Sequence, residues 1–237
     1  MSADGTHATA APVPARAATE GAAVPDALRV QMLATEHWSL LATRGMTWSE
    51  VMSRITIQLT VLSASLVVLA LVAQASGFGT AFHVLSIGLA SAILVLGTLT
   101  AVRVVLGSME DFALVQGMNR LRAAYVAIDP TLREYLVTSR HDDMAGVMHT
   151  YTLGTGRPVV AHVVGSTSMF VTVVNTIVAG TLGALIASAA SAPTALVAVV
   201  GVLAGAAYFA AMLQVSRRSF ERPRMPSRFP TPSPDAP

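Results

Sequence analysis

The sequence contains no cysteine and no lysine, and only 12% of its residues are charged. Without cysteine the chain can form no disulfide, thiolate metal site or cysteine nucleophile. Soluble proteins carry about 25% charged residues, so the low charge, together with 53% hydrophobic residues and a mean hydropathy of +0.61, indicates a membrane protein. A formal net charge of +2 is too small to attract nucleic acid by global charge.

Long apolar runs dominate the rest of the sequence. Each is long enough to cross about 30 Å of hydrocarbon as a helix. None contains an acidic residue or alternates like a barrel strand. We therefore expect an all-α, polytopic membrane protein with four transmembrane helices in two hairpins, at about residues 55–76, 84–105, 169–191 and 195–215.

Arginine is distributed unevenly around these spans. The two short connections within the hairpins carry no charge, whereas every arginine except Arg103 lies before the first span, in the loop at 107–168 or after the last span. The positive-inside rule then places both termini and the long loop in the cytoplasm. Arginine without lysine is typical of G+C-rich bacterial coding, so we expect a bacterial inner membrane.

Neither end of the chain shows the regular spacing of apolar residues that is typical of a packed helix. Residues 1–25 have no basic and apolar regions of a secretory signal, and residues 216–237 are rich in Arg, Pro and Ser. We expect both to be disordered. Basic residues beside a membrane attract anionic lipid by about 1 kcal/mol each, which predicts lipid binding at Arg217, Arg218, Arg222 and Arg224. Nucleic acid is not expected, because base-stacking aromatics are sparse.

The predicted cytoplasmic part is a small helical module. One helix should begin at Pro25-Asp26, and a capping box at Thr47–Glu50 should begin the first membrane helix. The second span should continue inward and end at Asp129-Pro130, before short helices near 131–137 and 139–151. Intervals of four and three residues form an apolar seam that should pack on the N-terminal helix or on a neighbouring subunit, at Leu114, Met118, Leu121, Tyr125 and Ile128.

Small residues predict close packing between membrane helices. The third span carries Gly180 and Gly183, and the fourth carries Gly201 and Gly205. Small residues four apart let helix backbones approach closely, either within one chain or between subunits. Asn175 is the deepest polar residue, and it either bonds across a helix interface or lines a transport path.

Two polar clusters are candidate sites. His141, Asp142 and His149 are residue types that ligate a divalent metal, but about 11–12 Å along a helix separates their ends, which favours a solvated helix start. Glu110-Asp111 could serve acid–base chemistry, although ion pairs with arginines such as Arg103 are the stronger expectation. We expect no metal and no cofactor.

Catalytic motifs are missing as well. Gly154-Thr155-Gly156 lacks the strand and the lysine of a phosphate-binding loop and indicates a turn. The sequence has no nucleophile elbow and no zinc-protease motif. These observations favour a protein that is not an enzyme.

Two stretches carry a resemblance to other proteins, namely HWSLLATRGMTWSEVMSR and GMNRLRAAYVAIDPTLREYLVTSRHDDMAGV. With the first span they resemble uncharacterised actinobacterial four-helix integral membrane proteins, over about residues 36–215. The resemblance implies membrane placement and an actinobacterial origin, and it carries over no activity and no functional residue.

The resulting hypothesis is a non-enzymatic bacterial inner-membrane protein whose cytoplasmic helical module mediates protein–protein or subunit interaction. Its expected partners are membrane lipid and a protein partner or a second subunit. The alternatives are an oligomeric channel or small exporter with a path near Asn175, and a ligand-switched effector that permeabilises the membrane.

Overall fold

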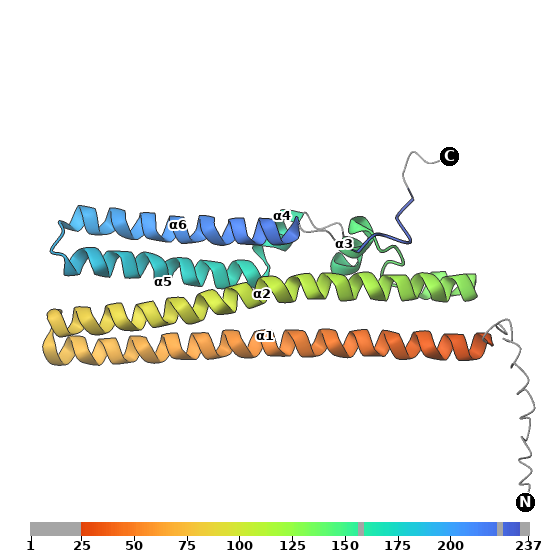
Figure 1. The fold of residues 1–237 in the computed structure, drawn as a ribbon, viewed down its shortest axis with the longest axis horizontal. Helices are drawn as coiled ribbons and strands as arrows, with labels where there is room; N and C mark the ends of the chain where they lie inside the picture. Colours follow the sequence, from red (N-terminus) through yellow and green to blue (C-terminus); the bar gives the residue numbers. More distant parts are fainter. Residues whose placement is uncertain (1–24, 156–158, 222–224, 233–237) are drawn as a thin grey trace, which may run out of the picture.

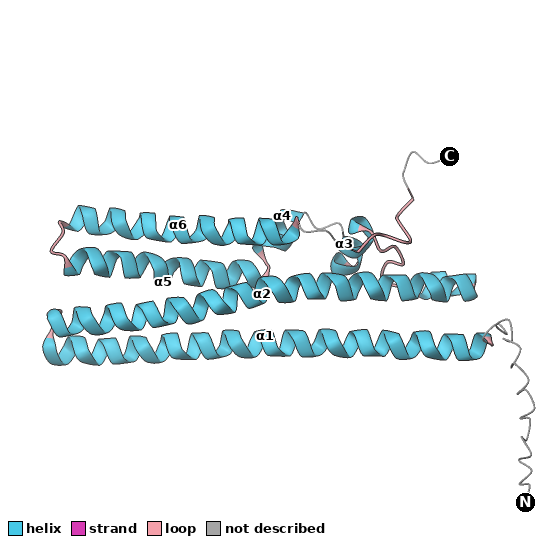
Figure 2. Cartoon of the chain, viewed as in Figure 1, coloured by secondary structure: helices cyan, strands magenta, loops and turns pink. Residues whose placement is uncertain are grey.

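The computed structural model describes residues 25–155, 159–221 and 225–232. Over these residues the chain is helical and contains no strand (Figure 2). The elements are α1 (Asp26–Ser76), α2 (Thr80–Ile128), the 3-10 helix η1 (Pro130–Tyr135), α3 (Met144–Thr152), α4 (Val159–Val164), α5 (Thr167–Ala189) and α6 (Thr194–Phe220). Helices α1, α2, α5 and α6 are each long and apolar enough to cross a membrane, which confirms the predicted fold class.

The four long helices form two antiparallel hairpins of unequal length. Helices α1 and α2 run side by side over their whole length, and the shorter α5–α6 hairpin lies beside one half of them (Figure 1). We call that region, residues 55–105 and 167–215, the apolar half. The polar half comprises the rest of α1 and α2 with η1, α3 and the C-terminal segment, residues 225–232.

Helix α1 differs from its prediction. It is one helix of 51 residues that begins at Asp26, where a helix start was expected. The capping box predicted at Thr47–Glu50 is wrong, because this stretch lies inside α1 and Glu50 pairs with Arg54 and Arg103 instead. Between residues 26 and 76 the sequence has no proline and one glycine, so nothing interrupts the helix.

The elements after the second span match the predicted order. Helix α2 continues to Ile128, and Pro130 opens η1 after Asp129, whose Oδ1 accepts a hydrogen bond from the Thr131 backbone N–H at 2.9 Å. Helix α3 starts at Met144, later than predicted, because Asp143 caps it by accepting from the Gly146 N–H at 2.8 Å. The residues before Asp143 are thereby left outside the helix.

Close backbone contact joins α5 to α6. A Cβ on Gly180 would lie 3.0 Å from the Gly201 carbonyl oxygen, and one on Gly205 would lie 3.2 Å from the Thr176 carbonyl oxygen. A Cβ on Gly183 would lie 2.7 Å from the Ala204 side chain. The structure therefore brings the predicted small residues together within one chain.

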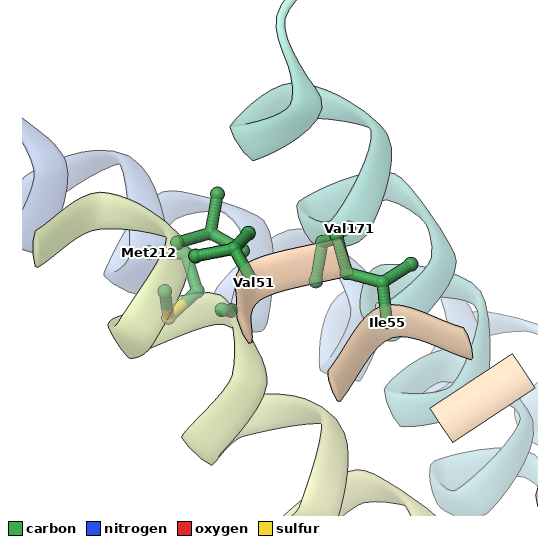
Figure 3. Packing of buried hydrophobic residues seen from close by; sticks show 6 residues of the cluster. Val51, Ile55, Val171 and Met212 are labelled. Atoms are coloured by element: carbon green, nitrogen blue, oxygen red, sulfur yellow. The ribbon is translucent and has the colours of Figure 1, made fainter. Parts of the chain in front are cut away.

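A small apolar core ties the two hairpins together. Val51 and Ile55 of α1 meet Val171 of α5 and Met212 of α6, all at most 7% exposed (Figure 3). The cluster lies where the apolar half meets the polar half. It fixes the position of the long hairpin relative to α5 and α6.

Some predictions fall outside the described residues. These are the N-terminal tail except Pro25, the lipid-binding Arg222 and Arg224, and Gly156 of the predicted turn. The predicted lipid-binding Arg217 and Arg218 lie in the last turn of α6.

Candidate functional site in the polar half

Buried amides on α2 position the loop that precedes α3. The Gln116 side chain donates to the Asp142 carbonyl oxygen at 2.7 Å, and the Asn119 side chain donates to the His141 carbonyl oxygen at 2.7 Å. Both amides are at most 4% exposed. Because buried amides need partners, these bonds hold the Asp142 backbone against α2 and direct its side chain toward the C-terminal segment.

The Asp142 carboxylate is fully buried and surrounded by donors. It accepts from the Ser227 hydroxyl at 2.6 Å, from the Arg228 backbone N–H at 2.9 and 3.0 Å, and from the Phe229 backbone N–H at 2.7 Å. Arg120 Nε donates to it at 2.5 Å and balances its charge. A buried carboxylate is tolerated when it is paired and hydrogen-bonded in this way.

These donors decide the protonation state of Asp142. Burial raises the pKa of its carboxyl, but the hydrogen bonds from Ser227, Arg228, Arg120 and Phe229 outweigh burial and hold the pKa well below its ordinary value of 3.8. The carboxylate therefore stays ionised at neutral and mildly acidic pH.

Further bonds align the C-terminal segment along α2 and α3. Gln116 also donates to the Met225 carbonyl oxygen at 3.1 Å, and the Arg120 guanidinium donates to the Pro226 carbonyl oxygen. Each side chain thus bonds both the Asp142 loop and the segment. Two α2 residues thereby hold together parts of the chain more than 80 positions apart.

The downstream part of the segment bonds to the start of α3. The Phe229 carbonyl oxygen accepts from the Asp142 N–H at 3.1 Å, and Asp143 accepts from the Thr231 N–H at 2.8 Å and from its hydroxyl at 2.9 Å. The prediction that residues 216–237 are disordered is therefore wrong for two parts. Helix α6 extends to Phe220, and residues 225–232 are docked on the polar half.

The favoured interpretation of His141, Asp142 and His149 as a solvated helix start is wrong for Asp142, which is fully buried. For the alternative, a metal site, the described residues include no group of three or more His, Asp or Glu side chains that could hold a metal ion. Asp142 uses its oxygens for the C-terminal segment and Arg120. His141 and Asp142 precede α3 while His149 lies in its last turn, so the three do not share the helix on which the prediction depended.

A second buried carboxylate joins α1, α2 and α3. Asp111, 3% exposed, accepts from Arg44 Nε at 2.6 Å, Trp48 Nε1 at 2.8 Å and the Tyr151 hydroxyl at 2.6 Å. Burial and the contact with Asp111 raise the pKa of Tyr151 above its ordinary value of 10, so its hydroxyl remains a donor. Both acids that were predicted to form ion pairs do so: Asp111 pairs with Arg44, and Glu110 pairs with Arg103 at 3.1 Å.

The apolar seam of α2 packs within the chain. The Tyr125 hydroxyl donates to the Leu33 carbonyl oxygen of α1 at 3.0 Å, and its ring stacks on His37 with centroids 5.9 Å apart. Met118 is buried in a core with Val115 and Val147, and Leu40 of α1 packs against it. Of the two partners predicted for the seam, the structure places the N-terminal helix of the same chain against it.

Asn175 is enclosed between helices. Its Oδ1 accepts from Gln58 Nε2 of α1 at 2.7 Å, and both side chains are at most 1% exposed. Gly97 of α2 makes room for the two amides, because a Cβ there would overlap the Asn175 side chain. In this structure Asn175 makes a cross-helix bond and does not face an open path.

Sequence reasoning missed several residues that build the site, namely Gln116, Asn119, Arg120, Ser227 and Thr231. The polar pair Gln116 and Asn119, three apart in a helix beside apolar residues, was an available signal. The C-terminal segment itself gave no such signal, because its composition is that of a disordered tail.

Comparison with known proteins found no match: no family model, no curated protein and no solved structure matches the chain.

Proposed function

We propose that the chain is a non-enzymatic bacterial inner-membrane protein whose helical module binds an extended protein segment in the cytoplasm. The observation that carries the proposal is the Asp142 site, which the chain's own C-terminal segment occupies. An incoming segment comes from a partner protein or from a second copy of the chain, and it displaces residues 225–232.

The chemistry of the site supports recognition of an extended segment. Asp142 accepts consecutive backbone N–H groups at Arg228 and Phe229, which any extended chain can offer. Hydroxyls four positions apart, on Ser227 and Thr231, add selectivity by bonding to Asp142 and Asp143. Recognition through backbone bonds with side-chain selectivity is a recurring mode of peptide binding.

The site is also held rigidly. Asp111 fastens α3 to α1 and α2 through Tyr151, Arg44 and Trp48, and the core around Val147 backs it. A site that is already in its binding geometry loses little conformational entropy on association. The rigid support of the Asp142 site therefore favours the interpretation of the polar half as a binding module and not as a flexible linker.

A competition experiment with the full chain tests the proposal. A fluorescent peptide of residues 225–232 should bind saturably to the protein in lipid nanodiscs. The chain's own segment competes with it, so Ser227→Ala in the protein should tighten peptide binding. The same substitution in the peptide should weaken binding. If Ser227→Ala tightens peptide binding when it is made in the protein and weakens it when it is made in the peptide, then the peptide and the chain's own segment bind the same site.

Two controls separate site binding from general adhesion. Asp142→Asn removes the charged acceptor, and a hydrogen bond to a charged group contributes about 1.5–3 kcal/mol. Because the chain's own segment loses the same bonds, this control is made in the Ser227→Ala protein. The peptide, which keeps the Ser227 hydroxyl, should bind more weakly there when Asp142 is replaced. Arg228→Ala in the peptide should change little, because the described contacts of Arg228 use its backbone N–H. Binding that ignores Asp142→Asn would contradict the proposal.

The cytoplasmic placement has its own test. The chain is free of cysteine, so single cysteines can be introduced without background. In intact cells, Ser191→Cys in the α5–α6 connection should react with an impermeant maleimide. Thr138→Cys, between η1 and α3, should react only after lysis. The reverse pattern would place the polar half outside.

A further inference from the structure

A cavity of about 650 Å³ opens where the two halves meet. Its walls come from the start of α5, the end of α6, the adjoining parts of α1 and α2, and α3. It therefore lies at the end of α5 and α6, and in the membrane placement proposed above this is the level where hydrocarbon gives way to headgroups. Its volume is within the range of about 300–1,000 Å³ that is usual for small-molecule sites.

The interior of the cavity is predominantly apolar. Aromatic and thioether side chains dominate its lining: Phe112, Met144, Met148, Phe209, Met212 and Phe220. Methionine side chains adapt to flexible apolar ligands. Met144 and Phe220 are at least 40% exposed, so part of the apolar lining is accessible at the edge of the cavity. An acyl chain would cover this surface.

The charge of the lining selects the headgroup. Arg44 and Asp111 neutralise each other across 2.6 Å. Arg217, exposed in the last turn of α6, is in no salt bridge within the described part of the chain. Ser166, Ser168 and Ser216 place hydroxyl groups in the same lining. The cavity thus combines an apolar interior with one unneutralised cation and several hydroxyl groups.

We propose that this cavity is a binding site for an anionic membrane phospholipid, with an acyl chain among the methionine and phenylalanine side chains and the phosphate at Arg217. Charge complementarity and the position at the membrane boundary select this occupant over a soluble ligand. The bound lipid contacts α3 on one side and α5 and α6 on the other. It fills a joint between the two halves and is distinct from the Asp142 site.

Tryptophan fluorescence gives a direct readout, because the chain has two tryptophans and Trp48 lines the cavity. The full-length Trp38→Phe variant keeps Trp48 as the sole fluorophore. In phosphatidylcholine nanodiscs, small fractions of phosphatidylglycerol with brominated chains should quench it saturably. Brominated phosphatidylcholine should require about five times the concentration, given the attraction of one basic residue for anionic lipid.

Adjacent arginines provide the matched comparison. Arg217→Gln should remove the preference for phosphatidylglycerol. Arg218→Gln, on the same helix but outside the cavity lining, should leave it unchanged. The reciprocal Trp48→Phe variant reports from Trp38, which is 71% exposed in the polar half, and should show no saturable quenching.

Three results would overturn the proposal. Equal effects of the two arginine substitutions would indicate general surface attraction. Quenching that merely follows the mole fraction of brominated lipid would indicate contact with bulk bilayer. Stronger saturable quenching by a free brominated fatty acid than by phosphatidylglycerol would assign the cavity to a free amphiphile. Unchanged helical circular dichroism in each variant confirms that the comparison is between folded proteins.

Discussion

The two halves of this protein are held together by different means. In the apolar half, α5 and α6 touch backbone to backbone at glycines, and the buried Gln58–Asn175 pair leaves one amide oxygen and one amide nitrogen without a partner. In the polar half, Asp111 and Asp142 are buried carboxylates, each with at least three donors. Close helix packing therefore holds the apolar half together, whereas buried, hydrogen-bonded carboxylates hold the polar half together.

This difference has a physical origin. Lipid tails are as apolar as the side chains they touch, so helices in a membrane gain most from close contact, for which small residues make room. Helices in water can use buried charges when every charge is satisfied. The charged clusters also connect distant parts of the chain, which is why the candidate site lies in the polar half.

The largest expected effect is the loss of the Asp111 carboxylate. Asp111→Ala leaves Arg44, Trp48 and Tyr151 without their acceptor. We expect it to destabilise the protein by about 3 kcal/mol, at the low end for a broken buried ion pair, because the Arg44 side chain keeps 34% exposure. Thermal or denaturant unfolding in detergent, followed by circular dichroism, measures the change.

The neighbouring acid is the control for that prediction. Glu110 pairs with Arg103, but its side chain is 50% exposed. Glu110→Ala should therefore change stability by less than about 1 kcal/mol. Equal destabilisation by the two substitutions would remove the distinction between buried and exposed charge in the polar half.

The next effect concerns space in the apolar half. Gly97→Ala would force a methyl group against the Asn175 amide and to 2.9 Å from Gln58 Nε2. We expect a loss of roughly 1–3 kcal/mol, typical of overpacking. Gly88→Ala on the same helix meets nothing within 4 Å and should be neutral or slightly stabilising. A melting-temperature series in one detergent compares the two, and equal effects would argue against close packing at Gly97.

A smaller effect is expected from the amide pair itself. The double variant Gln58→Leu with Asn175→Leu removes one hydrogen bond and two unpartnered polar atoms together. Membrane hydrogen bonds average about 0.6 kcal/mol, so we expect a change of less than about 1 kcal/mol. Each single variant leaves one amide unpartnered and should be less stable than the double variant. A double-mutant cycle measures this coupling, and additive single effects would contradict it.

The parts of this architecture that could be predicted from sequence are those that local chemistry determines. The spans follow from uninterrupted apolar length, and the end of α2 follows from Pro130. The prediction that a helix begins at the capping box was wrong, because Thr47 and Glu50 match the same sequence pattern inside a continuous helix. There Glu50 pairs with Arg103 of α2. Docking of the C-terminal segment depends on Asp142, and no local pattern connects positions so far apart in the sequence.

The smallest expected effect is that of mild acid on the C-terminal segment. The folded pKa of Asp142 lies below its unfolded value, so its stabilising contribution is complete above the ordinary value of 3.8 and declines only as the pH falls toward the folded pKa. Between pH 8 and pH 5 the segment should stay docked. Hydrogen-exchange protection of the Arg228 and Phe229 amides, corrected for intrinsic rate, measures docking.

A variant makes this pH prediction decisive. Asp142→Asn removes the titrating group and should lower protection of the two amides at every pH, so that wild type and variant differ by a constant factor from pH 8 to pH 5. That factor should shrink below about pH 4, where Asp142 begins to bind protons in the unfolded chain. Loss of wild-type protection between pH 7 and pH 5 would mean that another group controls docking, because the bonds from Ser227 and Arg120 keep Asp142 ionised throughout that range.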